Sequence, residues 1–202
     1  MFWQTDKQHN LPHNPFKSCI VPRPIAWIST ISQAGIANLA PYSYFNGVAT
    51  DPPMVMFSTD GLPENRGKDT LNNILQTREF VVNMVSSDLQ NAMNITSTSV
   101  APDVDEFELA GLDKSASRLV KPPGVKQSPI QMECVYFDKL ELPVTSSGLR
   151  NVLVTGKVVG IHIKDEFLND GIIDIERITP LARMGYQDYT KIDQVFKIVR
   201  PK

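Results

Sequence analysis

The run from Arg23 to Pro53 constrains the fold more than any other part of the chain. It opens with an apolar segment, Ile25 to Ile31, whose composition is typical of a buried strand. Ser32 to Gly35 then provides a turn in which Gly35 can adopt a positive φ, and Ile36 to Phe45 returns as a second strand. The run therefore predicts an antiparallel pair of strands that leads into small hydroxyl and amide residues.

The remaining sequence alternates strand patterns with short helical ones. Further strands are predicted over Met54–Ser58, Phe80–Val85, Ile130–Leu142 and Val152–Ile163, and a polar loop over Thr59–Gly67. Short helices are predicted from Asp69, from Ser86 and within Pro102–Gly111. Fifteen prolines, most of them in connections, favour a β-rich fold over a helical bundle. We expect one domain over residues 1–202, a mostly β barrel with short helices, with an N-terminal extension (1–18) and a C-terminal tail (187–202).

Composition excludes several classes of function. A net charge of -2 gives no basic surface for nucleic acid or for an anionic membrane. Cys19 and Cys134 are too few and too far apart for a disulfide framework or a metal site, which favours a reducing cytoplasm. The N-terminus lacks the pattern of a signal peptide, and no apolar run is long enough to span a membrane.

Two segments offer binding chemistry. Lys68-Asp69-Thr70 opens a predicted helix, and a helix N-terminus with a lysine and a hydroxyl suits an anion such as a phosphate. A capped surface helix with a solvated lysine explains the same residues. Tyr42 to Thr50 combines small residues with hydroxyl and amide groups and suits the polar edge of a flat ligand. Trp27 on the neighbouring strand fits either the ligand or the core.

The chain resembles the flavin reductase-like family with the FMN-binding split barrel fold. The resemblance runs from about Pro22 to Tyr186. Each motif alone is a weak indication of the family, but their number and their order along the chain make the resemblance specific. They are Pro22–Thr30, Asn38–Ser43, Phe45-Asn46, Asp51–Pro53, Lys68–Leu71 with Asn73-Ile74, Phe80–Asn83, Ala92–Asn94, Asp105–Phe107, Ala110–Leu112 and Pro180–Arg183.

The resemblance implies FMN as cofactor and a set of residues around it. The phosphate is expected at the start of the predicted helix, and the flavin ring along the segment that follows the second strand. The expected cofactor-binding residues are Trp27, Ser29, Thr30, Ser43, Phe45, Asn46, Val48, Ala49, Lys68, Asp69, Thr70 and Arg183. Arg183 is expected near the flavin of a partner subunit, with a surface salt bridge as the alternative.

The function implied is hydride transfer from NADH or NADPH to the flavin in a homodimer, with supply of reduced flavin to a partner monooxygenase as a further option. The cofactor carries this chemistry, so no catalytic side chain and no metal are expected. The alternative is a non-catalytic FMN-binding electron-transfer protein. A hydrolase is disfavoured, because the Gly-X-Ser-X-Gly motif is missing. His162 is expected to be an ordinary strand residue, and Asp103, Asp105 and Glu106 a solvated helix start.

Overall fold

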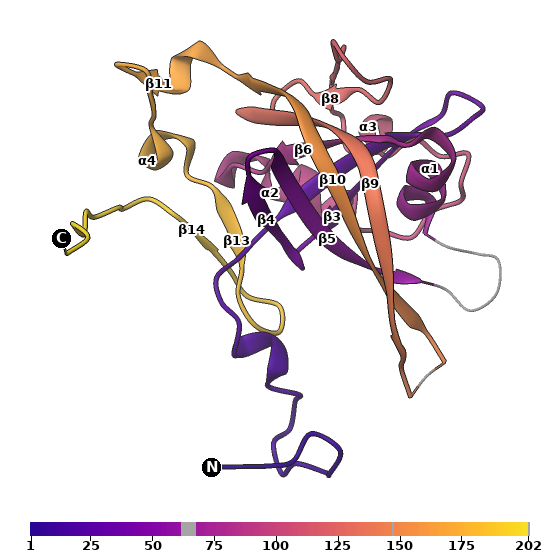
Figure 1. Cartoon of the computed structure of the whole chain (residues 1–202), viewed down its shortest axis with the longest axis vertical. Helices are drawn as coiled ribbons and strands as arrows, with labels where there is room; N and C mark the ends of the chain where they lie inside the picture. Colours follow the sequence, from indigo (N-terminus) through magenta and orange to yellow (C-terminus); the bar gives the residue numbers. More distant parts are fainter. Residues whose placement is uncertain (62–67, 147, 202) are drawn as a thin grey trace.

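The computed structural model describes residues 1–61, 68–146 and 148–201. Its centre is an antiparallel seven-stranded sheet in the order β3-β2-β6-β9-β10-β5-β4 (Figure 1). The strands are β2 (Ala26–Ile31), β3 (Ala37–Tyr42), β4 (Phe45–Thr50), β5 (Pro53–Gly61), β6 (Glu79–Met84), β9 (Ile130–Val144) and β10 (Arg150–Ile163). β5 continues through Thr59 to Gly61, where the sequence predicts a loop, and the rest of that loop lies outside the described residues.

The sheet curls into a barrel whose two edge strands are consecutive in sequence. Only Ser43 and Tyr44 separate the edge strands β3 and β4, and the backbone N–H of Ser58 donates to the carbonyl of Tyr44 at 2.8 Å. The sequence predicts one continuous strand over Ile36–Phe45, which is wrong at its end, because the chain leaves β3 at Tyr42 and starts β4 at Phe45. This break brings the polar segment to the seam between the two edges.

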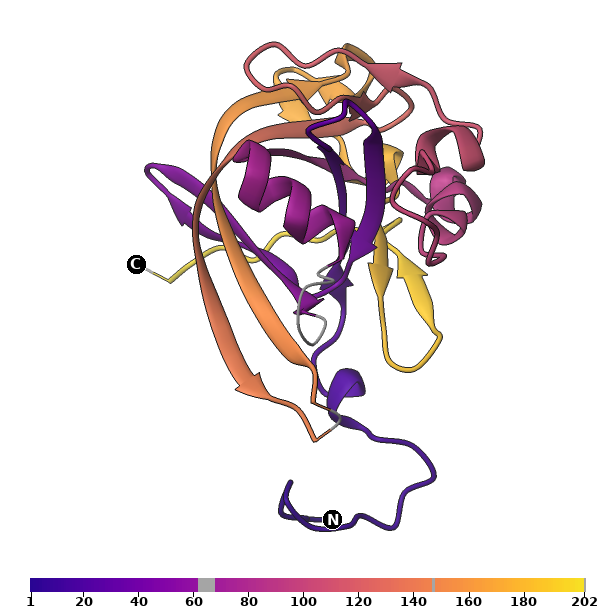
Figure 2. The same ribbon diagram turned by 90° about the vertical axis from the view of Figure 1, so that its right-hand side faces the viewer.

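Long strands close the barrel. β9 and β10 have 15 and 14 residues, and register shifts along their pairing let them bend around the core (Figure 2). Gly156 of β10 is needed for this packing, since a Cβ there would lie 2.4 Å from Cζ of Phe80. The predicted turn before β3 is confirmed: Gly35 has φ 85°, and Ser32 N–H donates to Ile36 O at 2.8 Å.

Smaller elements lie outside the seven-stranded sheet. A three-stranded sheet joins β1 (Arg23–Pro24), β13 (Leu181–Arg183) and β14 (Tyr189–Lys191), and two hairpins are formed by β7 (Lys114–Ser115) with β8 (Gly124–Val125) and by β11 (Leu168–Asn169) with β12 (Ile172–Ile173). The α-helices are α1 (Asp69–Thr77), α2 (Gln90–Ile95), α3 (Glu106–Leu109) and α4 (Ile175–Ile178), and the 3₁₀ turns are η1 (Phe16–Ser18), η2 (Ser87–Leu89) and η3 (Asp165–Phe167).

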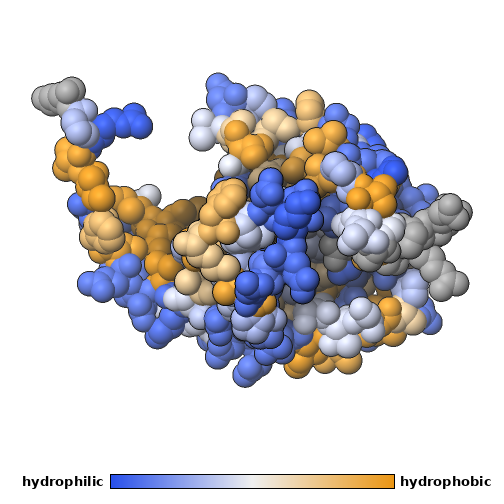
Figure 3. Space-filling view, turned by 90° about the horizontal axis from the view of Figure 1, so that it is seen from below, coloured by the Kyte–Doolittle hydropathy of each residue, from blue (hydrophilic) through white to orange (hydrophobic). Residues whose placement is uncertain are grey.

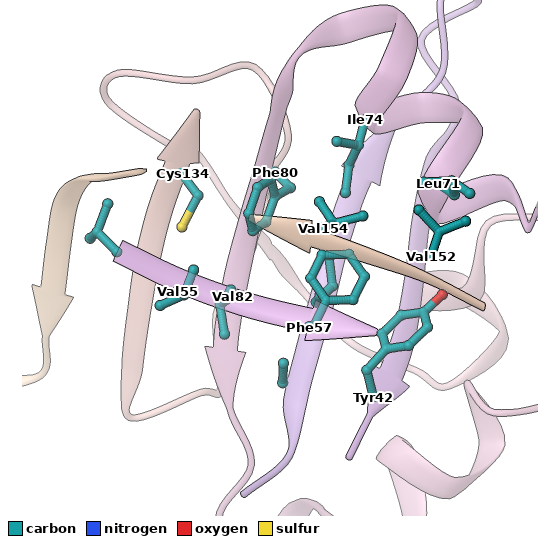
Figure 4. Close-up of a cluster of buried hydrophobic side chains, with 13 residues drawn as sticks. Tyr42, Val55, Phe57, Leu71, Ile74, Phe80, Val82, Cys134, Val152 and Val154 are labelled. Atoms are coloured by element: carbon teal, nitrogen blue, oxygen red, sulfur yellow. The ribbon is translucent and has the colours of Figure 1, made fainter. Parts of the chain in front are cut away.

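The barrel interior is an apolar cluster centred on Phe57, which is fully buried (Figure 4). Its ring lies 5.1 Å from that of Tyr42 in a tilted arrangement and 5.9 Å from that of Phe80 in the edge-to-face arrangement that aromatic pairs favour. Leu71 and Ile74 of α1 belong to the same cluster, so burial of their apolar surface holds α1 against the barrel. The position of α1 is therefore fixed relative to β3, which matters for the site.

Both ends of the chain extend from the barrel. The N-terminal segment and the residues after β14 run away from it as irregular chain (Figures 1 and 2). The C-terminal segment carries exposed apolar side chains, which stand out from the body of the molecule in Figure 3: Val195, Phe196, Ile198 and Val199. In the described part of the chain, no helix is long and apolar enough to cross a membrane.

Candidate functional site

A cavity of about 720 Å³ lies where the start of α1 meets the edge strand β3. We call it the α1 cavity. Its volume is within the range of about 300–1,000 Å³ that is usual for small-molecule sites. It is lined by Asn38, Ala40, Pro41, Tyr42, Lys68, Asp69, Thr70, Asn72, Thr96, Ser97, Thr98, Ser99, Val100, Pro102 and Glu106. The predicted anion-binding residues, Lys68 to Thr70, therefore share one cavity with the end of β3.

The first turn of α1 has the features of an anion site. Lys68 is the N-cap residue, its side chain is exposed, and it makes no side-chain capping hydrogen bond. The first N–H groups of a helix have no acceptor within the helix, and they lie at the positive end of its dipole. A phosphate at this end of the cavity would meet the Lys68 ammonium and these N–H groups together. The residues present therefore fit the phosphate of FMN.

Two carboxyl groups also line the cavity. Glu106 is only 4% exposed, so the expectation of a solvated helix start is wrong for this residue. Burial raises the pKa of Glu106, although hydrogen bonds from Leu39 N–H and the Asn38 amide oppose this, and the charge of Asp69 raises the pKa further. Burial also raises the pKa of Asp69, and this effect outweighs a hydrogen bond with its own backbone, which lowers the pKa.

Three predicted residues on β2 are buried and do not line the cavity. Trp27 is fully buried, and its indole N–H donates to Thr96 Oγ1 at 2.8 Å, which holds Thr96 on the cavity wall. Thr30 is buried and donates to Asn38 Oδ1 at 3.3 Å. Ser29 is buried and donates to the carbonyl of Pro123 at 2.5 Å. For Trp27 and Thr30 the geometry indicates support of wall residues, and Ser29 fastens a loop.

A second cavity, of about 540 Å³, holds three other predicted residues: Ser43, Phe45 and Asn46. We call it the β4 cavity. Its other lining residues are Phe16, Ile20, Pro22, Arg23, Pro24, Tyr44, Met56, Ser58, Leu142, Asn151 and Leu153. Consecutive residues of the chain line the two cavities, because Tyr42 lines the first and Ser43 the second. The seam between β3 and β4 thus separates the two groups of predicted residues.

The last predicted residues line neither cavity. Val48 is 54% exposed and lies at a register shift of β4, beside the exposed Ala49. Arg183 stacks on the ring of Tyr189 at 4.3 Å and donates to the carbonyl of Tyr186, so these contacts are within its own hairpin and involve no carboxylate. Contact of Val48, Ala49 and Arg183 with a flavin stays a prediction, as it does for the residues in the cavities.

Sequence reasoning missed part of the α1 cavity. Asn38 to Tyr42 belong to a motif that carries the family resemblance, so the sequence held a signal for them. The segment Thr96 to Val100 had none, because its place on the wall depends on the tertiary bond between Trp27 and Thr96. Glu106 also lies in such a motif, Asp105–Phe107, but its place on the wall was missed because a buried carboxylate contradicts the usual exposure of its residue type.

Comparisons with known proteins agree on one family. The chain matches the model of the flavin reductase like domain over residues 18–182. A protein of Aquifex aeolicus is 39% identical over 173 residues, which is 85% of this chain and 85% of that protein. The crystal structure of nitrilotriacetate monooxygenase component B from Bacillus cereus has a TM-score of 0.85 and 32% identity, covering 95% of this chain and 100% of that one.

The fold is shared more widely. A Shewanella frigidimarina protein with a split barrel domain superposes with a TM-score of 0.79 at 23% identity, covering 92% of this chain and 90% of that one. Together with the antiparallel barrel described above, this confirms the predicted mostly β, FMN-binding split barrel fold. The chain belongs to the flavin reductase-like family of flavoproteins.

Proposed function

We propose that the chain binds FMN with its phosphate in the α1 cavity, and that it transfers hydride from NADH or NADPH to the flavin. The observation that carries the proposal is that Lys68 and the first turn of α1 line the same cavity as the end of β3. A cation, helix N–H groups and a concave wall together suit a phosphate attached to a larger organic group. The similarity to nitrilotriacetate monooxygenase component B supports a role as a reductase.

The flavin ring would extend from this phosphate along the seam toward Ser43, Phe45 and Asn46. Ala40, Pro41 and Tyr42 offer a wall with few charges, and the backbone and side chains of the following residues offer hydrogen-bonding groups for a polar rim. When bound, FMN would supply the redox chemistry, as the group that takes up hydride from the nicotinamide. The protein's part is to hold the two rings in contact and to keep the phosphate fixed.

The proposal includes a homodimer, a cytoplasmic location and a separate monooxygenase that uses the reduced flavin. Exposed apolar side chains on the C-terminal segment, such as Phe196 at 83% exposure, support burial against another chain. Cys19 and Cys134 are free thiols, which supports a reducing compartment. The monooxygenase is supported by the name of the Bacillus cereus relative, a component of such an enzyme.

Steady-state oxidation of NADH and NADPH, with and without added FMN, tests this function. We expect oxidation of at least one of the two nucleotides, and we expect it to depend on FMN. Anaerobic titration of the FMN-loaded protein should show bleaching of the flavin absorbance by the same nucleotide. A protein that binds FMN but oxidises neither nucleotide would contradict the reductase and support the electron-transfer alternative.

A further inference from the structure

A buried chain of hydrogen bonds links Glu106 to the α1 cavity. Oε1 of Glu106 accepts a hydrogen bond from Nδ2 of Asn38 at 2.8 Å, and Oε2 accepts one from the backbone N–H of Leu39 at 3.0 Å. The oxygen of the same Asn38 amide accepts a hydrogen bond from the hydroxyl of Thr70 at 2.7 Å. Glu106, Asn38 and Thr70 are 4%, 7% and 1% exposed, so water does not compete freely for these groups.

Both carboxyl oxygens of Glu106 accept hydrogen bonds, and this fixes the direction of every other bond in the chain. Because Oε1 accepts, the NH₂ group of Asn38 must face it. The amide oxygen of Asn38 then faces the other way, toward Thr70 and, at 3.3 Å, Thr30. A threonine hydroxyl has one proton, and Thr70 gives that proton to Asn38. Only the lone pairs of the Thr70 hydroxyl remain for a ligand in the cavity.

We infer that Glu106 is a positioning residue that acts through Asn38 to make the Thr70 hydroxyl an acceptor toward the α1 cavity. Thr70 in this state takes a hydroxyl group of a ligand, and it does not bind a phosphate oxygen, which at neutral pH offers only lone pairs. This departs from the simpler expectation that Thr70 donates to the phosphate. The inference rests on the proposed function only for the identity of the ligand as FMN, in which the hydroxyl groups are those of the ribityl chain.

Glutamine at position 106 should reverse the chain. The N–H of Leu39 needs an acceptor, so the oxygen of Gln would face Leu39 and its NH₂ group would face Asn38. Asn38 then turns its oxygen toward position 106 and its NH₂ group toward Thr70. The Thr70 hydroxyl becomes an acceptor within the protein, and its proton becomes free for the cavity. The long contact with Thr30 also reverses, because the Thr30 hydroxyl accepts from Asn73 at 3.0 Å with one lone pair and has a second one for the Asn38 NH₂ group.

A double-mutant cycle on the apoprotein tests the inference. The four proteins are wild type, Glu106→Gln, Thr70→Val and the double variant, and flavin fluorescence gives the Kd of FMN and of riboflavin for each. The quantity compared is the preference for FMN, which is the ratio of the riboflavin Kd to the FMN Kd. Thr77→Val is the matched control, because Thr77 lies on the same helix, lines neither cavity and donates to the carbonyl of Asn73.

We expect Thr70→Val to change this preference by less than about twofold in the wild-type background. Glu106→Gln should raise the preference about tenfold, the size of one added hydrogen bond to a charged group, and Thr70→Val should abolish that rise. A tenfold loss of preference in Thr70→Val alone would overturn the inference, as would an unchanged preference in a folded Glu106→Gln protein. The single variant Thr70→Val needs no change at Glu106. A tenfold loss of FMN preference in this variant therefore overturns the inference even if Glu106→Gln does not fold.

Thermal unfolding without ligand gives an independent readout. In the wild type, Thr70→Val leaves the Asn38 oxygen with Thr30 as a donor, whereas in Glu106→Gln it leaves one of the two buried N–H bonds of the Asn38 NH₂ group without an acceptor. We therefore expect Thr70→Val to lower Tm by about 3 °C or more beyond its wild-type effect when position 106 is Gln. Additive changes in Tm would contradict the inference. If FMN does not bind but this coupling is found, the proposed function fails and the positioning role of Glu106 stands.

Discussion

Oε1 of Glu133 lies 2.5 Å from Nε2 of His162, and the same buried carboxylate accepts three backbone N–H groups. These donors are the N–H groups of Arg118, Leu119 and Val120, at 2.7, 2.6 and 3.1 Å. One side chain of β9 thus fastens a loop to the outside of the barrel, and His162 of β10 completes its hydrogen bonds. His162 is a half-buried residue of a strand, as expected, but its contact has a structural role that the strand pattern does not reveal.

Glu133→Gln should destabilise the protein at neutral pH. Burial tends to raise the pKa of Glu133, but the hydrogen bonds from Arg118 N–H, His162 and Leu119 N–H outweigh it and hold the pKa below its ordinary value of 4.5. The ionised carboxylate therefore stabilises the fold above about pH 4.5, and this contribution is lost as the pH falls through the lowered pKa. We expect the free energy of unfolding to fall by about 1–3 kcal/mol at pH 7 and by less in acid, as measured by denaturant unfolding at several pH values.

Glu141→Gln is the matched control for that experiment. Glu141 also has a lowered pKa, caused first by its hydrogen bonds to Lys139 and Arg150, but it is exposed on the same strand. Exposed ion pairs contribute little, so the midpoint of unfolding should barely move. An equal loss of stability in both variants, or a Glu133→Gln penalty that grows toward low pH, would contradict the role assigned to Glu133.

His162→Ala should leave NAD(P)H oxidation within about tenfold of the wild-type rate. The hydride passes between two cofactors, so no side-chain proton transfer needs to limit the step. Steady-state rates and Tm are measured on the same flavin-loaded preparation. A fall in turnover beyond about a hundredfold in a folded protein would show that His162 takes part, because positioned acid–base groups contribute about that much or more.

Asn46→Leu should weaken FMN and riboflavin equally, by about fivefold to tenfold. Asn46 lines the β4 cavity, where the ring is proposed to lie, and both flavins have the same ring. Fluorescence titration of both ligands checks this, with Asn169→Leu on the exposed hairpin β11–β12 as control. Unchanged affinities for both flavins would place Asn46 outside the site.

The barrel could be predicted from the sequence because its signals are local. The turn at Ser32 to Gly35, the apolar runs of β2 and β6 and the strand patterns of β9 and β10 depend only on neighbouring residues, and the structure confirms them. The seam between β3 and β4 could not be predicted, since it depends on where the sheet meets itself. Pattern alone reads Ser43 and Tyr44 as a continuation of the strand.

The candidate site could be predicted only in part for the same reason. Lys68 to Thr70 were found because a helix start with a lysine is visible in the sequence. The burial of Glu106 is set by α3 packing against β3, and its bonds to Asn38 and Leu39 span 68 and 67 positions in the chain. No local pattern reports such a contact, and the usual exposure of glutamate argues against it.

The central claim is that the phosphate of FMN binds at Lys68, and the most direct test is titration of Lys68→Ala with FMN and with riboflavin. We expect the Kd for FMN to rise about tenfold to a hundredfold, the Kd for riboflavin to stay within about twofold, and Tm to remain near the wild-type value. Lys126→Ala, at an exposed lysine that lines neither cavity, should change neither Kd. Equal Kd values for FMN and riboflavin in the wild type, or an equal loss of both in Lys68→Ala, would contradict the account.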